Sequence, residues 1–406
     1  MSPMLEQVGF RQSWEETLRA IKDRRVIALL FLGFSAGLPI LLVFSTLSVW
    51  LREAEVSRAT IGFFSWAALG YAFKFVWAPV IDALPVPLLT RRFGRRRSWL
   101  LISQALVIGS LVGMALTDPQ LSLAQMAVFA VFLGFSSATQ DVIIDAYRIE
   151  VADQELQGLL SAAYIAGYRM GMLIAGAGAL EIAGIFGEQG VYSPWAWSLS
   201  YLIMAGAMLI GVATTLVIAE PKKKYHESGP EWSKSDYARL VNGLFFALGA
   251  FVAVFFISAD FTMAMKGFLA IADGLTKGVW SFAVEAIRLG VAVFVSYVVV
   301  RTLIAAELVS GVMVERMYVA PFKDFFSRYG RAALLIIALI STYRIADVVM
   351  GVMANIFYVD IGFEKQEIGR ITKGFGLIMT IVGGFFGGIL TIRFGIMRIL
   401  FLGAVL

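Results

Sequence analysis

At residues 26–50 the chain reads VIALLFLGFSAGLPILLVFSTLSVW, without a charged side chain. About 20 consecutive apolar residues are enough for a helix to cross the roughly 30 Å hydrocarbon core of a bilayer. The stretch is too long for the apolar region of a cleavable signal peptide, and no small-residue cleavage site follows it. It therefore predicts a membrane-spanning helix.

The composition extends this prediction to the whole chain. Of the 406 residues, 59% are hydrophobic and only 16% are charged, whereas soluble domains are about 45–50% apolar and about 25% charged. These values exclude a cytosolic enzyme, a disulfide scaffold and a disordered chain. With no cysteine and only one histidine, His226, the sequence indicates no disulfide, no metal site and no cofactor.

Further apolar runs of helical length follow along the chain. They are too continuous for the alternating strands of a membrane barrel, so we expect an all-α polytopic membrane protein. The ten expected spans lie near residues 26–50, 59–81, 99–117, 122–146, 158–182, 197–219, 240–260, 281–304, 331–357 and 367–390. Another apolar run starts near residue 398 and continues to Leu406.

The basic residues predict the orientation of these spans. Arginines and lysines gather in the N-terminal segment, in the loop after the second span and after the sixth span, whereas the connections after the third and fifth spans have none. Because cytoplasmic loops are enriched in Lys and Arg, we expect the N-terminus to be cytoplasmic.

The organisation of the chain is predicted from loop lengths and from a weak internal repeat. Residues 61–94 begin with Ile-Gly and end with Arg-Phe-Gly, as do residues 368–395, and many secondary transporters are built from repeats; a chance match is the alternative. We expect a cytoplasmic segment (1–25), a complete N-terminal six-helix bundle (26–220), a cytoplasmic linker (221–238), two inserted helices (239–305), a cytoplasmic basic segment (306–330) and the start of a truncated, incomplete C-terminal bundle (331–406). On this interpretation the chain is a natural fragment or the product of an incomplete gene model.

The loop after the second span resembles a known signature. Asp82 ends the span and the cluster RRFGRRR follows at residues 91–97, similar to the cytoplasmic motif of the major facilitator superfamily. The resemblance implies a cytoplasmic gate, for which we expect Asp82, Gly94, Arg95, Arg96 and Arg148. The alternative is a plain positive-inside signal.

Four other stretches narrow the resemblance. They are LGFSAGLP at 32–39, FKFVWAPVID at 73–82, ATQDVIIDAYR at 138–148 and YRIAD at 343–347. Together they resemble AmpG, the muropeptide permease family of the major facilitator superfamily. This implies proton-coupled import of anhydro-muropeptides (GlcNAc-anhydroMurNAc with or without peptide) across the bacterial inner membrane, for peptidoglycan recycling and, in some bacteria, β-lactamase induction. The implied partners are this small molecule, protons and the lipid bilayer, with no nucleic acid.

Polar residues inside the spans are the candidates for transport, because ionisable groups in a bilayer are costly and usually face the bundle interior. Carboxylates of a muropeptide call for cations, here Lys74, Arg169 and Arg344. Sugar rings call for aromatic faces, here Tyr71, Trp77, Tyr168 and Tyr343, and Gln140 could bond substrate. Gly33, Gly37, Gly167 and Gly171 predict close helix approach.

Proton coupling needs an acid that can gain and lose a proton inside the membrane. Asp141 and Asp145 lie four residues apart, on one helical face, and Asp347 is the alternative. The competing interpretation is structural: these acids could pair permanently with Arg148, Arg169 or Arg344.

Two other functions stay open. One is a transporter of acetyl-CoA or another large anion, and the other is a membrane sensor that does not transport. An enzyme is not expected, because there is no catalytic residue set, no phosphate-binding Gly-rich loop and no soluble domain of size.

Overall fold

The computed structural model describes residues 22–57, 60, 61, 64, 67, 69–187, 191–221, 232–268, 275–339 and 376–405. Within these ranges the ordered elements are helices and there is no strand, which confirms an all-α protein. The chain divides into two units. The first comprises Met1–Ile81, Pro85–His226 and Val348–Leu406, and the second comprises Asp82–Leu84 and Glu227–Asp347.

Among the residues that the structure describes, seven helical stretches are long and apolar enough to cross a membrane. They are Arg24–Glu53, Arg95–Ala115, Leu123–Val151, Gln154–Phe186, Pro194–Val217, Ser235–Ala259 and Ala283–Ala305. Each overlaps a predicted span. This confirms a polytopic membrane protein, as the sequence predicts.

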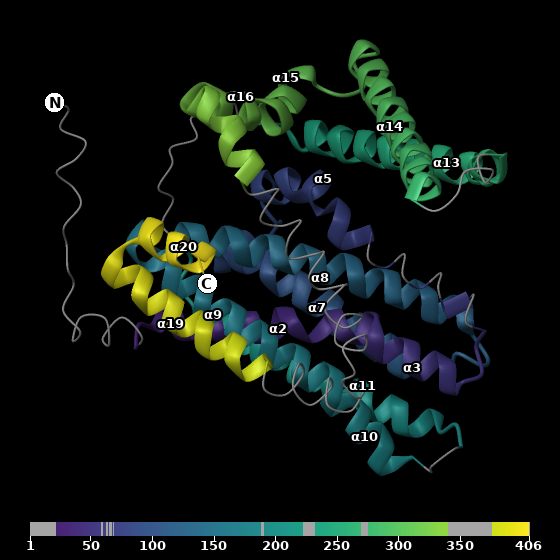
Figure 1. The fold of residues 1–406 in the computed structure, drawn as a ribbon, viewed down its shortest axis with the longest axis vertical. Helices are drawn as coiled ribbons and strands as arrows, with labels where there is room; N and C mark the ends of the chain where they lie inside the picture. Colours follow the sequence, from purple (N-terminus) through teal and green to yellow (C-terminus); the bar gives the residue numbers. More distant parts are fainter. Residues whose placement is uncertain are drawn as a thin grey trace. The chain divides into compact units, whose positions relative to one another are not determined.

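The helices of the first unit match the expected spans to within a few residues where they are described (Figure 1). They are α2 (Arg24–Val43), α3 (Ser45–Glu53), α5 (Leu69–Ala83), α6 (Leu89–Phe93), α7 (Arg95–Ala115), α8 (Leu123–Val151), α9 (Gln154–Leu173), the π-helical turn η3 (Ile174–Gly178), α10 (Ala179–Phe186), α11 (Pro194–Ala207), α12 (Leu209–Val217), α19 (Gly376–Phe394) and α20 (Ile396–Val405). The expected span at 331–357 is described only for residues 331–339, which are helical.

Helices α2 and α9 run side by side along much of their length (Figure 1). A Cβ atom added at Gly33 or Gly37 of α2 would overlap the backbone of Tyr164 or Tyr168. One added at Gly167 of α9 would overlap the backbone of Leu30, and Gly171 meets Phe34 in the same way. The prediction that these four glycines allow close helix approach is confirmed, because only hydrogen side chains fit between the two backbones.

Large apolar side chains fill the rest of the first unit. The Trp50 ring stacks on Trp197 with 5.6 Å between ring centres, and Tyr201 lies 4.8 Å from Trp50. The Trp197 indole donates to Glu53 at 2.8 Å and the Tyr201 hydroxyl donates to the carbonyl of Leu42 at 2.8 Å. Each buried polar tip therefore has a partner, as such groups need in a low-dielectric interior.

The second unit consists of a long helix pair followed by short helices (Figure 1). The pair is α13 (Lys234–Phe268) and α14 (Leu275–Ala305), which lie against each other. The short elements are α15 (Gly311–Val314), the π-helical turn η5 (Glu315–Val319) and α16 (Ala320–Tyr329). Both helices of this pair extend beyond the predicted ends of their apolar runs.

Candidate functional site

One face of α8 carries polar side chains at four-residue intervals, which places them above one another on the helix. They are Ser137, Asp141 and Asp145. The Tyr71 hydroxyl of α5 donates to Ser137 Oγ at 2.8 Å. One turn along α5, the Trp77 indole donates to Thr139 Oγ1 at 3.1 Å, and its ring packs 4.5 Å from the Phe135 ring. Two predicted aromatic residues thus come together on α8.

Asp141 is the buried acid of this group, with 7% of its surface exposed. The charges of Lys74 and Asp145 act on it, and the Tyr164 side chain of α9 lies close by. Within the described part of the chain, its carboxyl oxygen Oδ1 has no hydrogen-bond partner. A buried carboxyl with unused bonding capacity is uncommon where packing is the only role.

Asp145, one turn further, is bound differently. Its Oδ1 lies 3.4 Å from Arg148 Nη2, and its side chain is 45% exposed. Arg148 also donates to the Ser161 hydroxyl of α9. The structural pairing that competed with a proton role is therefore present for Asp145. Arg148 of α8 is thus held by Asp145 on its own helix and by Ser161 on α9.

Tyr164 was not among the predicted site residues, although it contacts Asp141. Its ring lies 5.9 Å from the ring of Tyr168, one turn along α9. The close crossing with α2 fixes the position of both tyrosines, because Gly33 and Gly37 contact their backbones. The signal in the sequence was the four-residue spacing of two tyrosines around Gly167.

The predicted cations lie at different depths. Lys74 is half-buried on α5, whereas Arg169 is exposed on α9. Tyr168 lies between the two kinds of charge, since both Asp141 and Arg169 act on it. Tyr343, Arg344 and Asp347 lie outside the described residues.

Gln140 is fully buried, and its amide donates to Ser35 Oγ of α2 at 3.0 Å. Beside this contact, Gln104 of α7 donates to Thr215 of α12 at 3.0 Å. Among the described residues its amide oxygen, Oε1, has no hydrogen-bond partner, so the contact of Gln140 with substrate stays a prediction. Because successive helical residues point about 100° apart, Gln140 faces the bundle core while Asp141 faces α9.

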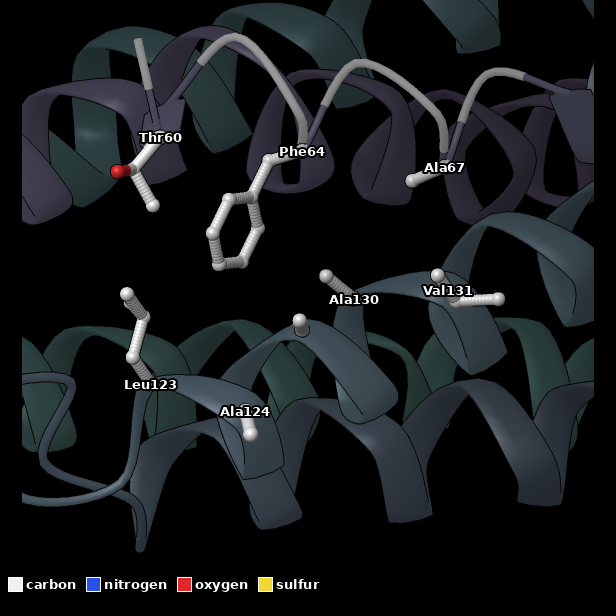
Figure 2. A pocket seen from close by; sticks show the side chains of 8 residues that line it. Thr60, Phe64, Ala67, Leu123, Ala124, Ala130 and Val131 are labelled. Atoms are coloured by element: carbon white, nitrogen blue, oxygen red, sulfur yellow. The ribbon is translucent and has the colours of Figure 1, made fainter. Parts of the chain in front are cut away.

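An apolar hollow of about 310 Å³ lies elsewhere, between residues 60–67 and the first half of α8 (Figure 2). Phe64, Ala67, Leu123 and Val131 are among the residues that line it, and Thr60 is the polar one. Without a charged lining residue it suits hydrocarbon better than a carboxylate or a sugar. The polar group around Asp141 is therefore the better candidate for a transport site.

Charged side chains join the helix ends near Gly94. Gly94 has φ +86°, a conformation that favours glycine, and begins α7. The Glu220 carboxylate accepts from the backbone N–H groups of Arg96 at 2.8 Å and Arg97 at 3.1 Å. Arg96 Nε donates to Glu150 at 3.0 Å, and Arg95 lies 3.7 Å from the same carboxylate.

This arrangement gives the predicted gate residues partners that were missed. Gly94, Arg95 and Arg96 come together with Glu150 and Glu220, the acids near the ends of α8 and α12. Arg148 is occupied by Asp145 instead. Asp82 is exposed and belongs to the second unit. The signal available in the sequence was an acid near the end of two of the predicted spans, Glu150 and Glu220.

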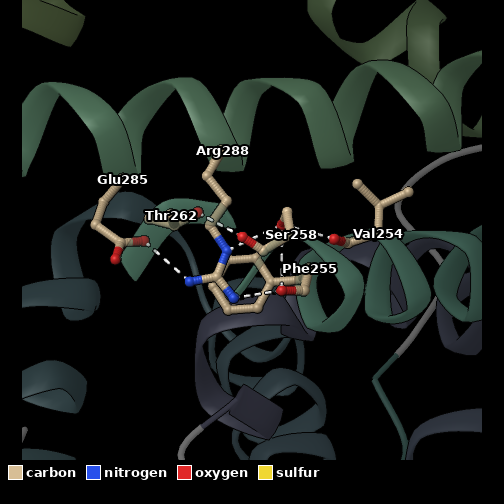
Figure 3. A network of polar contacts seen from close by, with 6 residues as sticks. All are labelled: Val254, Phe255, Ser258, Thr262, Glu285 and Arg288. Atoms are coloured by element: carbon tan, nitrogen blue, oxygen red, sulfur yellow. Dashed lines mark hydrogen bonds and ion pairs between the residues drawn. The ribbon is translucent and has the colours of Figure 1, made fainter. Parts of the chain in front are cut away.

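A second charged pair inside a span was also missed (Figure 3). Arg288 of α14 lies 3.3 Å from Glu285 and donates to Ser258 Oγ of α13 at 3.2 Å. It also donates to the carbonyl of Phe255, whose ring lies 3.8 Å from the guanidinium carbon. Arg288 thus joins α13 to α14.

Comparisons with known proteins agree with this geometry. The sequence model of the family described as acetyl-coenzyme A transporter 1 matches residues 25–239, more than half of the chain. Putative transporter AmpG 4 of Rickettsia felis is 31% identical over 377 residues, covering 93% of this chain and 70% of that protein. The chain belongs to the AmpG family of membrane transporters.

Two other relatives support the same assignment. The anhydromuropeptide permease of Escherichia coli K12 is 29% identical over 391 residues, and putative transporter AmpG 3 of Rickettsia prowazekii is 27% identical over 389 residues. These alignments cover 96% and 95% of this AmpG-family chain, and 60% and 72% of the relatives. The named relatives are transporters and permeases, and this chain is a multi-pass membrane protein of the major facilitator type.

Within the described residues there is no group of three or more His, Cys, Asp or Glu side chains that could hold a metal ion. The candidate site therefore consists of aromatic rings, hydroxyls and single charges. Such a set can bind a polar, anionic molecule and exchange a proton with it or with water.

Proposed function

We propose that this protein imports anhydro-muropeptides across the bacterial inner membrane by alternating access, with its N-terminus in the cytoplasm. The observation that carries the proposal is the similarity to the E. coli anhydromuropeptide permease over 391 residues, 96% of this chain. Import of these cell-wall fragments would serve peptidoglycan recycling and, through it, β-lactamase induction.

The substrate chemistry fits the residues around Asp141. GlcNAc-anhydroMurNAc carries hydroxyls and two sugar rings, and a stem peptide adds carboxylates. Lys74 and Arg169, with Arg344, would bind carboxylates, because cations in a partly dehydrated cavity make strong charge-assisted hydrogen bonds. Tyr71, Trp77 and Tyr168, with Tyr343, would contact the rings.

Proton coupling is assigned to Asp141 in this proposal. It is buried, Tyr164 lies close to it, and its Oδ1 has no partner among the described residues, so a proton or a substrate hydroxyl could meet that oxygen. Asp145 is the weaker candidate because Arg148 occupies it. Asp347 is the alternative in the second half of the chain.

Opening and closing of the cytoplasmic side is assigned to the charged contacts around Gly94. Arg96 binds Glu150, while Glu220 binds the first backbone N–H groups of α7. Acids at a helix N-terminus are stabilised by the helix dipole. Breaking these contacts would let the ends of α7, α8 and α12 separate.

The test is uptake into inverted and right-side-out membrane vesicles from E. coli cells that lack their own permease and produce this protein. We expect radiolabelled GlcNAc-anhydroMurNAc-tripeptide to accumulate when an inward proton gradient is imposed, and unlabelled substrate to compete. Vesicles without the protein give the background. Binding without accumulation would support a sensor instead.

A second candidate is transport of acetyl-CoA or another large anion, favoured by the description of the matching family model. Acetyl-CoA is also polar and anionic, and would use the same cations. The same vesicles separate the two: competition by acetyl-CoA, with no competition by the muropeptide, would overturn the primary proposal.

A further inference from the structure

Helix α16 separates apolar from charged side chains along its length. Phe322, Phe325, Phe326 and Tyr329 recur at intervals of three and four residues, which places them on one face. Lys323, Asp324, Ser327 and Arg328 lie between them. The helix is therefore amphipathic from Phe322 to Tyr329.

The aromatic face is open. Phe322 is 67% exposed, Tyr329 51% and Phe326 41%. Phe325 packs on its neighbours, with its ring 5.7 Å from Phe326 and 5.2 Å from Tyr329. The rings thus form one continuous surface that is not covered by the described parts of the chain. An exposed aromatic patch of this kind marks an interaction surface.

The charged side chains of α16 form ion pairs with each other and with η5. Arg328 pairs with Asp324 at 2.8 Å, one helical turn away, and Lys323 pairs with Glu315 of η5 at 2.6 Å. Residues 311–331 carry four basic side chains, Arg316, Lys323, Arg328 and Arg331, against two acidic ones, Glu315 and Asp324. The small positive excess fits an anionic surface.

The position of α16 in the chain points to the kind of partner. The apolar helix α14 ends at Ala305, 15 residues before α16 begins. On the other side, Gly330 adopts φ +51° and the chain enters helical residues 331–339, where Leu334, Leu335 and Leu339 are exposed. Because a positive φ ends a helix and redirects the chain, α16 and the following apolar helix are separate elements.

We propose that α16 lies in the plane of the membrane surface, with its aromatic face in the lipid and its charged face in water. Amphipathic helices that bury an aromatic face beside basic residues bind at this depth. The apolar helices on both sides bring α16 to the bilayer, so a lipid surface is the partner that the chain itself supplies. The positive excess favours the anionic leaflet.

The test uses the absence of cysteine from the chain, which allows single labels without background. Single variants F322C, F326C and Y329C report on the aromatic face, and K323C, D324C and S327C report on the charged face. Each carries a nitroxide spin label, in vesicles of phosphatidylethanolamine and phosphatidylglycerol. F294C on α14, where Phe294 is 64% exposed, is the lipid reference, and A306C in the following turn is the water reference.

We expect the aromatic-face labels to collide several-fold more with oxygen, relative to a water-soluble nickel complex, than the charged-face labels do. Their values should approach that of F294C, whereas the charged-face labels should approach A306C. Equal access of both faces to nickel would overturn the proposal. Shielding of the aromatic face from both reagents would also overturn it, because a protein would then cover that face.

A second measurement needs no substitution. The unmodified protein is placed in vesicles whose phospholipid acyl chains carry a diazirine, then illuminated and digested with trypsin. We expect label in the peptide Asp324–Arg328, on Phe325 or Phe326. Label on α14 peptides without any on this peptide would contradict the proposal, whatever the behaviour of the cysteine variants.

Discussion

Two charged side chains inside membrane spans, Asp141 in the first unit and Arg288 in the second, are used in opposite ways. Arg288 donates to Ser258 and to the Phe255 carbonyl, pairs with Glu285 and lies over an aromatic ring. Asp141 lies close to Tyr164 and keeps one buried oxygen without a partner in the described part of the chain. An intramembrane charge that is bonded to the neighbouring helix holds helices together, whereas one with an unpartnered buried oxygen can serve transport.

The packing around each charge explains the difference. In the first unit, α2 and α9 are joined by backbone contact at four glycines, so Asp141 is not needed to hold them. In the second unit, a Cβ at Gly249 or Gly290 would meet open space, so these glycines do not bring α13 and α14 together. There a side-chain network, centred on Arg288, joins the two helices.

The largest expected effect is on transport. Asp141→Asn keeps the shape of the side chain but cannot exchange a proton, so we expect accumulation driven by a proton gradient to be abolished in vesicles. Thermal unfolding in detergent should stay close to that of the unmodified protein. Unchanged accumulation would remove Asp141 from the proton role, and a large loss of stability would place it in the same class as Arg288.

Asp145→Asn is the matched control for this prediction. It removes the same charge from the same face of α8, but the lost contact is an ion pair with Arg148 on a half-exposed side chain. We expect gradient-driven accumulation to persist, with a small loss of stability at most. Abolished accumulation in this variant alone would transfer the proton role to Asp145.

The second effect concerns the glycine contacts. Gly167→Leu forces a side chain against the Leu30 backbone, and overpacking of this kind costs about 1–3 kcal/mol. We expect a lower melting temperature and aggregation in detergent. Both are measured by fluorescence-detected gel filtration. Gly290→Leu on α14 makes the same substitution in open space and should melt like the unmodified protein. Equal behaviour of the two variants would contradict the contrast between the units.

The third effect separates α13 from α14. Arg288→Met keeps much of the side-chain volume but removes the donors to Ser258 and Phe255. Interhelical hydrogen bonds in membranes contribute about 1–2 kcal/mol at most, so we expect a moderate loss of stability, measured by denaturant unfolding in detergent. A double-mutant cycle with Ser258→Ala should show coupling. Additive effects would mean that this bond is not what joins the helices.

Several of these features could be predicted from the sequence, and others could not. Length and hydrophobicity are enough to place the spans, and small residues four apart are enough to predict that α2 and α9 each approach another helix closely. The direction of Gln140 was also available, since it is one residue from Asp141 and must point to another face. The charge of Arg288 within an apolar run is visible in the sequence too.

The pairing of charges between different helices could not be predicted from the sequence. Glu150 and Glu220 are 54 and 124 residues from Arg96, and their meeting depends on which helix ends the fold brings together. Tyr164 joins Asp141 only because the glycine crossing fixes the rotation of α9. Periodicity predicts which face a residue shares with its own helix neighbours, whereas the partner across the interface is set by packing.

The smallest expected effect is at the N-terminal end of α2, where the charged side chain of Asp23 lies outside the span. Asp23 accepts from the Arg25 backbone N–H at 2.8 Å and pairs with the Arg25 side chain at 2.7 Å. The hydrogen bond from that side chain lowers the pKa of Asp23 from its usual 3.8, against the opposing effect of partial burial. The resulting stability is present above about pH 3.8 and is lost as the pH falls through the lower folded-state value.

Asp23→Asn isolates this charge, because asparagine is as good an N-cap as aspartate. Both side chains of the pair are partly exposed, so we expect a loss of about 0.5 kcal/mol at pH 7, seen as a small drop in melting temperature. The difference from the unmodified protein should shrink as the pH falls from 3.8 through the lower folded-state pKa, because Asp23 then becomes neutral in both states. Glu155→Gln, an exposed charge in the first turn of α9, should show no such trend. A difference that persists at low pH would assign the effect to the cap and not to the ion pair, leaving helix packing as the main support of this end of the first unit.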